Sequence, residues 1–252
     1  MFSTLHFIWL ALCTVLIVAS SIITIKKRLP MQTGLTVLCV ACVLSEVVKI
    51  FCVLISEQRK NDYGVFIKET DLPFHLCSLQ IFFAFIARLT KKENLRNFLL
   101  VFMIPTCALG GVAALLIPTI TCAFTNVRTY QYFLYHAAII WFAAFAVGRS
   151  GVKLHFKAYL KMLATLLAIV FITFYINGFF QNTNFLYLSE PPMDGLPVLN
   201  MDNGWFVYFL SYMGLAIALI ALFFAPFWII YARRAKKERE ASKVAEDTAS
   251  VC

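Results

Sequence analysis

A cysteine and a histidine in two separate apolar segments are the side chains of this sequence best suited to covalent chemistry. Cys77 follows Pro73 by four residues, and His136 is the seventh residue of an apolar run that begins at residue 130. If both runs are helices that enter a membrane from the same side, a rise of about 1.5 Å per residue puts the two side chains at similar depth. A thiolate is a strong nucleophile, and an imidazole from a neighbouring helix is a suitable base for the thiol. The pattern therefore predicts a catalytic pair of Cys77 and His136.

Polar side chains in these segments form the second part of this prediction, and Lys49 and Asn177 are expected near the depth of Cys77 and His136. Glu46 and Lys49 are three residues apart in an apolar segment, so they share a helix face and can pair. Charged groups in hydrocarbon are costly and usually face a partner or a cavity, so the sequence leaves open a structural ion pair or a polar site. Candidate substrate-binding residues are Glu46, Lys49, His75, Gln80 and Asn177. Of these, Lys49, His75, Gln80 or Asn177 would polarise an acyl carbonyl.

The segment around Cys77 has the features of a helix start. Asp71 suits a helix cap and Pro73 suits a first turn, so His75 and Cys77 are expected within the first two turns of a helix over residues 73–89. Residues two apart point about 200° apart on a helix, so His75 is not expected to pair with Cys77. His136 stays the preferred base, although a lone histidine in a membrane helix also serves to bond a neighbouring helix.

Composition shows what kind of elements hold these residues. The chain has 252 residues, of which 61% are hydrophobic and 14% charged, more apolar surface than one soluble core can bury. A helix that crosses the hydrocarbon needs roughly 20 apolar residues. Seven segments qualify, and the third is the shortest: 5–25, 35–56, 73–89, 98–117, 130–148, 159–180 and 205–231. We therefore expect an all-α bundle of seven transmembrane helices over residues 1–231, and a charged cytoplasmic tail over 232–252 that is either a helical extension or disordered.

Charge distribution predicts the orientation of the bundle. Connections near residues 26–28, 88–96 and 149–161, together with the tail, hold 17 Lys and Arg residues, whereas the alternate connections hold four. Lys and Arg gather on the cytoplasmic side of membrane proteins, so the N-terminus is expected outside and the C-terminus in the cytoplasm. The net charge of +9 then reflects topology, and nucleic-acid binding is not expected.

Two other segments bear on the site. The outer connection 181–204 is long, rich in proline and asparagine, and contains an apolar cluster at 185–188, which suggests a cap over a site. Gly110 and Gly111 lie between Pro105 and Pro118 and predict close helix packing. No HExxH, Walker A or GxSxG motif occurs, so no metal or nucleotide cofactor is expected.

Four stretches together resemble the YwaF-like bacterial integral membrane proteins, a family related to the animal transmembrane protein 164 group. They are LPFHLCSLQ (72–80), GGVAALLIP (110–118), QYFLYHAAI (131–139) and NTNFLYLSEPP (182–192). The resemblance implies a seven-helix membrane fold. For the animal group it implies acyl transfer between phospholipids by a membrane-embedded cysteine and histidine, and the positions that match here are Cys77 and His136.

Three functions fit these observations. The first is a thiol-dependent phospholipid acyltransferase or lipid hydrolase of the plasma membrane, with membrane lipids as its partners and substrates that enter from the outer leaflet. The second is a transporter or small-molecule binding protein that uses Glu46, Lys49 and His136. The third is a structural or assembly partner that acts through the outer loops and the tail. The oligomeric state is left open.

Overall fold

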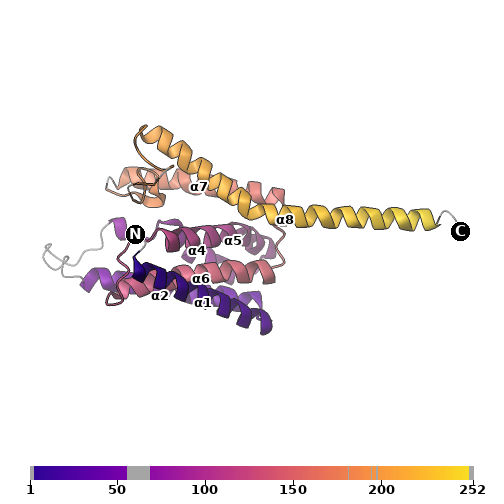
Figure 1. Ribbon diagram of the computed structural model, residues 1–252, viewed down its shortest axis with the longest axis horizontal. Helices are drawn as coiled ribbons and strands as arrows, with labels where there is room; N and C mark the ends of the chain where they lie inside the picture. The colour runs from indigo at the N-terminus through magenta and orange to yellow at the C-terminus, as the bar shows by residue number, and fades with distance from the viewer. Residues whose placement is uncertain (1–2, 56–68, 181, 194, 197, 250–252) are drawn as a thin grey trace.

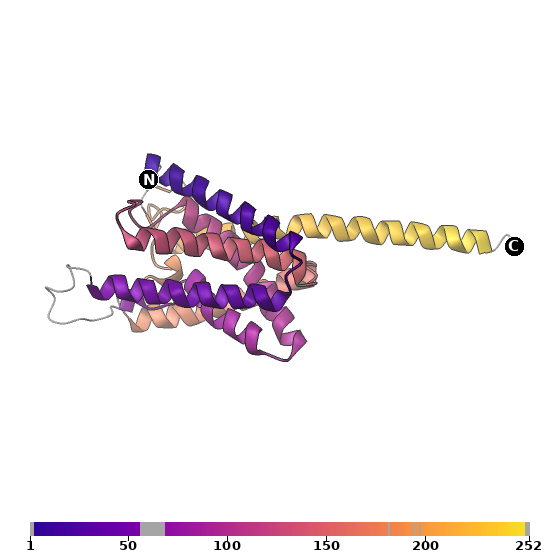
Figure 2. The same ribbon diagram turned by 90° about the horizontal axis from the view of Figure 1, so that it is seen from below.

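Seven α-helices that run alternately in opposite directions form the body of the described part of the chain (Figures 1 and 2). The computed structural model describes residues 3–249 except 56–68, 181, 194 and 197. The helices are α1 (Thr4–Lys26), α2 (Met31–Ile55), α4 (Leu76–Leu89), α5 (Glu93–Leu116), α6 (Val127–Arg149), α7 (Phe156–Phe179) and α8 (Trp205–Ala249), with 3₁₀ turns η1 (Glu69–Asp71) and η2 (Phe185–Tyr187). This part of the chain contains no strand, so the all-α prediction is confirmed.

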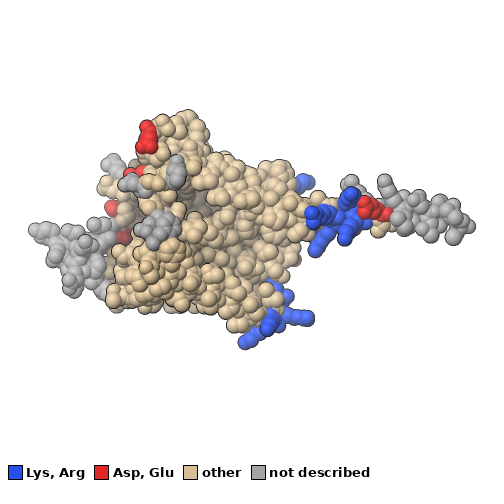
Figure 3. Space-filling view, in the orientation of Figure 1, with Lys and Arg blue, Asp and Glu red and all other residues tan. Residues whose placement is uncertain are grey.

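The outer surface of the bundle is that of an integral membrane protein. Six of the helices are long and apolar enough to cross a membrane, whereas α4 has 14 residues. At about 1.5 Å per residue α4 is about 21 Å long, shorter than the roughly 30 Å of hydrocarbon. Figure 3 shows a band without charged residues between an end that carries acidic side chains and an opposite end where Lys and Arg gather. Many large apolar side chains of α1, α2 and α7 are exposed, as lipid-facing residues are.

Helices α5 and α6 form the centre of the bundle. Every residue from Leu99 to Cys107 in α5 is buried, and α6 buries Phe133, Phe142 and Ala146 among others. On one flank α1 packs against α6, where the rings of Trp9 and Phe133 stack with their centroids 4.9 Å apart. Because α5 and α6 are packed so closely, each side chain on them is held at a defined height along the axis of the bundle.

Helices α7 and α8 form a pair that lies to one side of the other five (Figure 1). Near the basic end, Tyr159 of α7 packs edge-on against Phe224 and Trp228 of α8, and these residues join the main core. At the other end, Val170 of α7 forms a separate apolar cluster with Leu186 and Leu188 of the outer connection. The pair is thus held at both ends.

Several predicted boundaries differ from those of the structure. The predicted helix 73–89 starts at Leu76, and the assignment of Asp71 as its cap and Pro73 to its first turn was wrong. Asp71 belongs to η1, the amide of Phe74 donates to the carbonyl of Leu72, and His75 is the N-cap in an extended conformation. Predicted helix 98–117 begins at Glu93 instead, and the last helix continues through the tail to Ala249. The tail is therefore a helical extension, one of the two predicted alternatives.

Candidate functional site

A cavity of about 540 Å³ lies inside the bundle, within the range of pockets that hold small molecules. Its wall includes residues of α2, α4, α5, α6, α7, α8 and both 3₁₀ turns. Of the residues proposed from the sequence, Cys77, His136, Glu46, Lys49 and His75 line it.

Cys77 presents its thiol to this cavity from the first turn of α4. Among the seven described cysteines, it is the one found in the cavity wall, and its side chain is half-buried while those of Cys39, Cys42 and Cys107 are buried. The hydroxyl of Tyr135 donates to the carbonyl of Cys77 at 2.5 Å, which ties the start of α4 to α6. The thiol is therefore both accessible from the cavity and anchored through its own backbone.

His136 lines the same cavity from the middle of α6. Its Nδ1 lies 2.7 Å from the carbonyl oxygen of Tyr132, one turn earlier. A carbonyl only accepts hydrogen bonds, so Nδ1 carries the proton and neutral His136 keeps its lone pair on Nε2. The ring also packs against Tyr132, with centroids 4.3 Å apart, which limits its rotation. His136 is thus an oriented imidazole whose Nε2 is the basic nitrogen.

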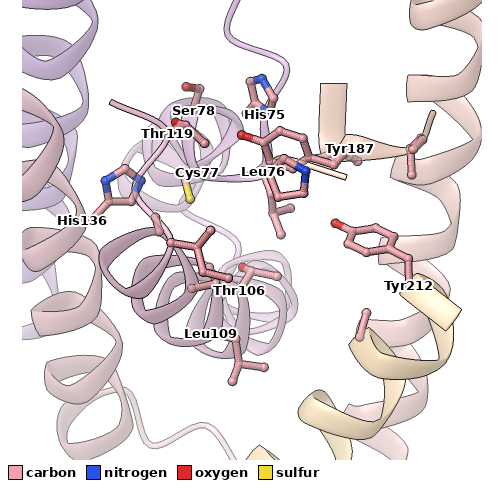
Figure 4. A pocket seen from close by; sticks show the side chains of 18 of the residues that line it. His75, Leu76, Cys77, Ser78, Thr106, Leu109, Thr119, His136, Tyr187 and Tyr212 are labelled. Atoms are coloured by element: carbon pink, nitrogen blue, oxygen red, sulfur yellow. The ribbon is translucent and has the colours of Figure 1, made fainter. Parts of the chain in front are cut away.

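Two adjacent glycines of α5 bring these groups to one level. A methyl group at Gly110 would lie 3.4 Å from the sulfur of Cys77, and one at Gly111 would lie 3.1 Å from the backbone oxygen of His136. One glycine thus faces the thiol and its neighbour lets α5 and α6 approach closely, as the sequence predicted for this pair. Figure 4 shows Cys77 and His136 among the side chains that line the cavity.

The cavity wall near α2 and the start of α6 is polar. Lys49 and Glu46 form an ion pair there, so the predicted pairing is present, and both residues line the cavity. Arg128 donates to the side-chain oxygen of Gln131 at 2.7 Å, and Gln131 donates to the hydroxyl of Ser45 at 2.5 Å. This relay was not predicted from the sequence, although an arginine in the first turn of an apolar helix is a signal for it.

The other wall of the cavity is apolar and extends deep along α7 and α8. Met162, Leu166 and Val170 of α7 are four residues apart and form one stripe, which faces Leu219 and Ile220 of α8 across the same space. Figure 4 shows Tyr212 of α8 directed toward the cavity from the side opposite His136. The site thus combines a polar region, a thiol with an imidazole, and a long apolar slot.

Gln80 and Asn177 lie outside the cavity wall. Gln80 is fully buried and donates to the hydroxyl of Thr106 at 3.0 Å, which joins α4 to α5. Asn177 accepts from the amide of Phe185 at 2.9 Å and donates to its carbonyl at 3.0 Å, and it also accepts from Thr183. Both residues position the elements around the site.

The outer connection covers one side of the cavity through η2. Leu186 and Tyr187 have φ values of 57° and 53°, a left-handed conformation that costs roughly 1–2 kcal/mol per residue for L-amino acids. Hydrogen bonds hold this turn: Trp205 donates to the carbonyl of Leu188 at 2.9 Å and Tyr208 to that of Tyr187 at 2.5 Å. Strained residues held so firmly are typical of functional sites.

Burial determines the charge states of His75 and Tyr187, two cavity residues at or near η2. Burial, with a smaller contribution from the charge of Lys49, lowers the pKa of His75 to about 4, so His75 is neutral at pH 7. Burial raises the pKa of Tyr187, so its hydroxyl stays protonated. Both groups are therefore neutral hydrogen-bonding partners.

The fold and the site define a class: a multi-pass helical membrane protein with an internal cavity that carries a thiol and an imidazole. Among the described residues no group of three His, Cys, Asp or Glu side chains is placed to hold a metal ion. The sequence matches the model of the TMEM164 family over residues 1–224, and the chain belongs to this family. No curated protein and no solved structure matches it.

Proposed function

We propose that the protein is a thiol-dependent phospholipid acyltransferase, with Cys77 as the nucleophile and His136 as its general base. The observation that supports this most is that a cavity-facing thiol and an imidazole with its basic Nε2 unprotonated line the same cavity. Family membership agrees, since the resemblance of these segments to the animal transmembrane protein 164 group implies acyl transfer between phospholipids.

In the first half-reaction, His136 Nε2 accepts the proton of the Cys77 thiol while the sulfur attacks the carbonyl carbon of a lipid ester. The carbon–sulfur bond forms, the ester carbon–oxygen bond breaks, and the leaving oxygen takes the proton back from the imidazolium. The products are a thioester on Cys77 and a lysophospholipid. Lys49 and His75, which share the cavity, are the proposed groups that polarise the acyl carbonyl.

In the second half-reaction, His136 removes the proton from the hydroxyl of an acceptor lysophospholipid. The acceptor oxygen attacks the thioester, the carbon–sulfur bond breaks, and the thiolate recovers the proton from His136. Atoms and charge balance over the cycle, and the apolar slot along α7 and α8 provides room for the acyl chain. With water as the acceptor, the same steps would amount to hydrolysis.

The proposed topology places the outer connection and the N-terminus outside the plasma membrane and the end of α8 in the cytoplasm. The separation of basic and acidic ends in Figure 3 supports this orientation. Substrate lipid would then come from the outer leaflet.

The test is acyl transfer by the purified chain in lipid nanodiscs, with an isotope-labelled lysophospholipid as acceptor and mass spectrometry of the products. We expect Cys77→Ala to abolish transfer and His136→Ala to reduce it by roughly 10²- to 10⁴-fold, the usual contribution of a general base. Intact-mass measurement should also detect an acyl group on wild-type protein that hydroxylamine removes. Cys39→Ala, which deletes a buried thiol outside the cavity wall, is the matched control and should retain activity.

Transfer by Cys77→Ala at the wild-type rate would refute the proposal. Solute binding or transport is the second candidate function, because the Glu46–Lys49 ion pair also lines the cavity. Transport predicts the opposite pattern: Cys77→Ala is silent and Glu46→Gln abolishes uptake.

A further inference from the structure

Arg128 is a cavity residue to which the proposed reaction gives no role. It is the second residue of α6, at the end of the helix that faces the outer connection, and its side chain is half-buried. The Arg128–Gln131–Ser45 relay holds the guanidinium against the polar wall by one of its five N–H donors. Within the described chain its guanidinium makes no second hydrogen bond, so the remaining donors are available to a ligand.

Among the described residues, the guanidinium of Arg128 has no ion-pair partner. The other cation of the wall, Lys49, is already paired with Glu46. Glu46 and Asp71, the two carboxylates of the wall, attract Arg128 from a distance, but no described carboxylate lies within ion-pair distance of it. A guanidinium in a largely apolar cavity is stabilised by an oxyanion partner, and its planar fork matches phosphate oxygens.

The position of Arg128 on α6 suits a ligand that extends to the thiol. Arg128, Tyr132 and His136 are successively four residues apart and line one face of the helix. Eight residues correspond to about 12 Å along the helix axis, and the arginine side chain covers part of that distance. In a glycerophospholipid the acyl esters lie a few bonds from the phosphate, so a phosphate at Arg128 would bring an ester toward the level of His136 and Cys77.

We infer that Arg128 binds the phosphate group of the lipid substrate and thereby sets which part of the lipid reaches Cys77. The inference rests on the proposed function for the identity of the ligand as a phospholipid. Arg128 is a positioning residue, since it acts on the headgroup and makes no contact with the reacting ester. Phosphate recognition would also distinguish phospholipids from neutral acylglycerols, which carry the same ester.

Binding to protein that lacks the nucleophile tests this without requiring catalysis. The full chain with Cys77→Ser, in a maltoside detergent free of phosphate, is titrated with a lysophospholipid and with a monoacylglycerol of the same acyl chain. Arg128→Gln should weaken lysophospholipid binding by roughly 10- to 100-fold, as for loss of charge-assisted hydrogen bonds, and leave monoacylglycerol binding unchanged. Arg128→Lys keeps the charge without the fork and should recover part of the affinity.

Lys153→Gln is the control, because it removes one positive charge from an exposed position outside the cavity wall. Equal losses for both lipids, or no loss for either, would overturn the inference. Inorganic phosphate that competes at the same concentration as the lysophospholipid would also overturn it, since the site would then bind a free anion.

Activity measurements separate this inference from the proposed function. In an active wild-type enzyme, Arg128→Gln should raise KM for phospholipid with a smaller change in kcat, and unfolding temperatures of the two proteins should agree. The wild-type protein could transfer no acyl group and still show the Arg128-dependent preference for lysophospholipid. That result would refute the proposed acyl transfer and support the phosphate site.

Discussion

Alanine substitutions at the two adjacent glycines of α5 provide a matched test of the site geometry. A methyl group at Gly110 would lie 3.4 Å from the sulfur of Cys77, an ordinary van der Waals contact. At Gly111 it would lie 2.5 Å from a side-chain carbon of Ile140 and 3.1 Å from the backbone oxygen of His136. The first substitution therefore fits the structure, and the second pushes α5 away from α6.

The expected difference in stability follows from these distances. Both substitutions gain about 0.5–1 kcal/mol from replacing glycine in a helix, so this contribution cancels in the comparison. Overpacking costs roughly 1–3 kcal/mol, and each kcal/mol lowers the unfolding temperature of a chain of this size by roughly 2–4 °C. Gly111→Ala should therefore unfold about 2–12 °C below Gly110→Ala.

Thermal unfolding in detergent measures the stability, and the rate of Cys77 alkylation by a small maleimide measures access to the thiol. Gly110→Ala should keep the unfolding temperature and slow alkylation, because the new methyl group lies against the sulfur. Gly110→Leu should slow it further. Equal unfolding temperatures for the two alanine variants would refute the reasoning, since α5 and α6 would then not be in close contact at Gly111.

Other predictions concern the groups around the cavity. Glu46→Gln and Lys49→Met should each destabilise the protein by roughly 1–3 kcal/mol, and the double variant should lose less than the sum, as a double-mutant cycle in thermal unfolding would show. Asn177→Ala should raise hydrogen exchange over residues 182–190 and lower stability by roughly 1–3 kcal/mol, because three hydrogen bonds are lost, whereas the exposed Asn182→Ala should do neither. Gln80→Leu should reduce stability by less than about 1 kcal/mol, because its buried side-chain oxygen has no hydrogen-bond partner and Thr106 still donates to Phe102.

Hydropathy predicted the helical architecture well because a membrane helix needs a long apolar run, which a sequence displays directly. Six of the predicted segments correspond to helices long enough to span the membrane. The start of α4 was misjudged because the Asp-Leu-Pro sequence is compatible with both a helix cap and a tight turn. The structure contains the turn, with the amide of Phe74 bonded to the carbonyl of Leu72, and this choice depends on tertiary contacts of the loop.

Cys77, His136 and Lys49, which were expected at similar depth, line one cavity, but depth alone does not show which way a side chain faces. Asn177 was expected at the same level, and it instead bonds the backbone of Phe185 outside that wall. Its rotation about α7 depends on how the outer connection folds back, which hydropathy does not encode. The relay from Arg128 to Ser45 was not predicted because it joins two helices, with Gln131 and Ser45 86 positions apart in the sequence.

Helix α8 connects two distant parts of the molecule. It runs 45 residues without interruption, about 68 Å at the usual rise, and Pro226 removes one hydrogen bond within it. Its first turn is fastened to the connection over the cavity through Trp205 and Tyr208, and its last turn lies far beyond the bundle on the opposite side (Figure 1). One continuous helix therefore joins the connection over the cavity to a point far outside the bundle.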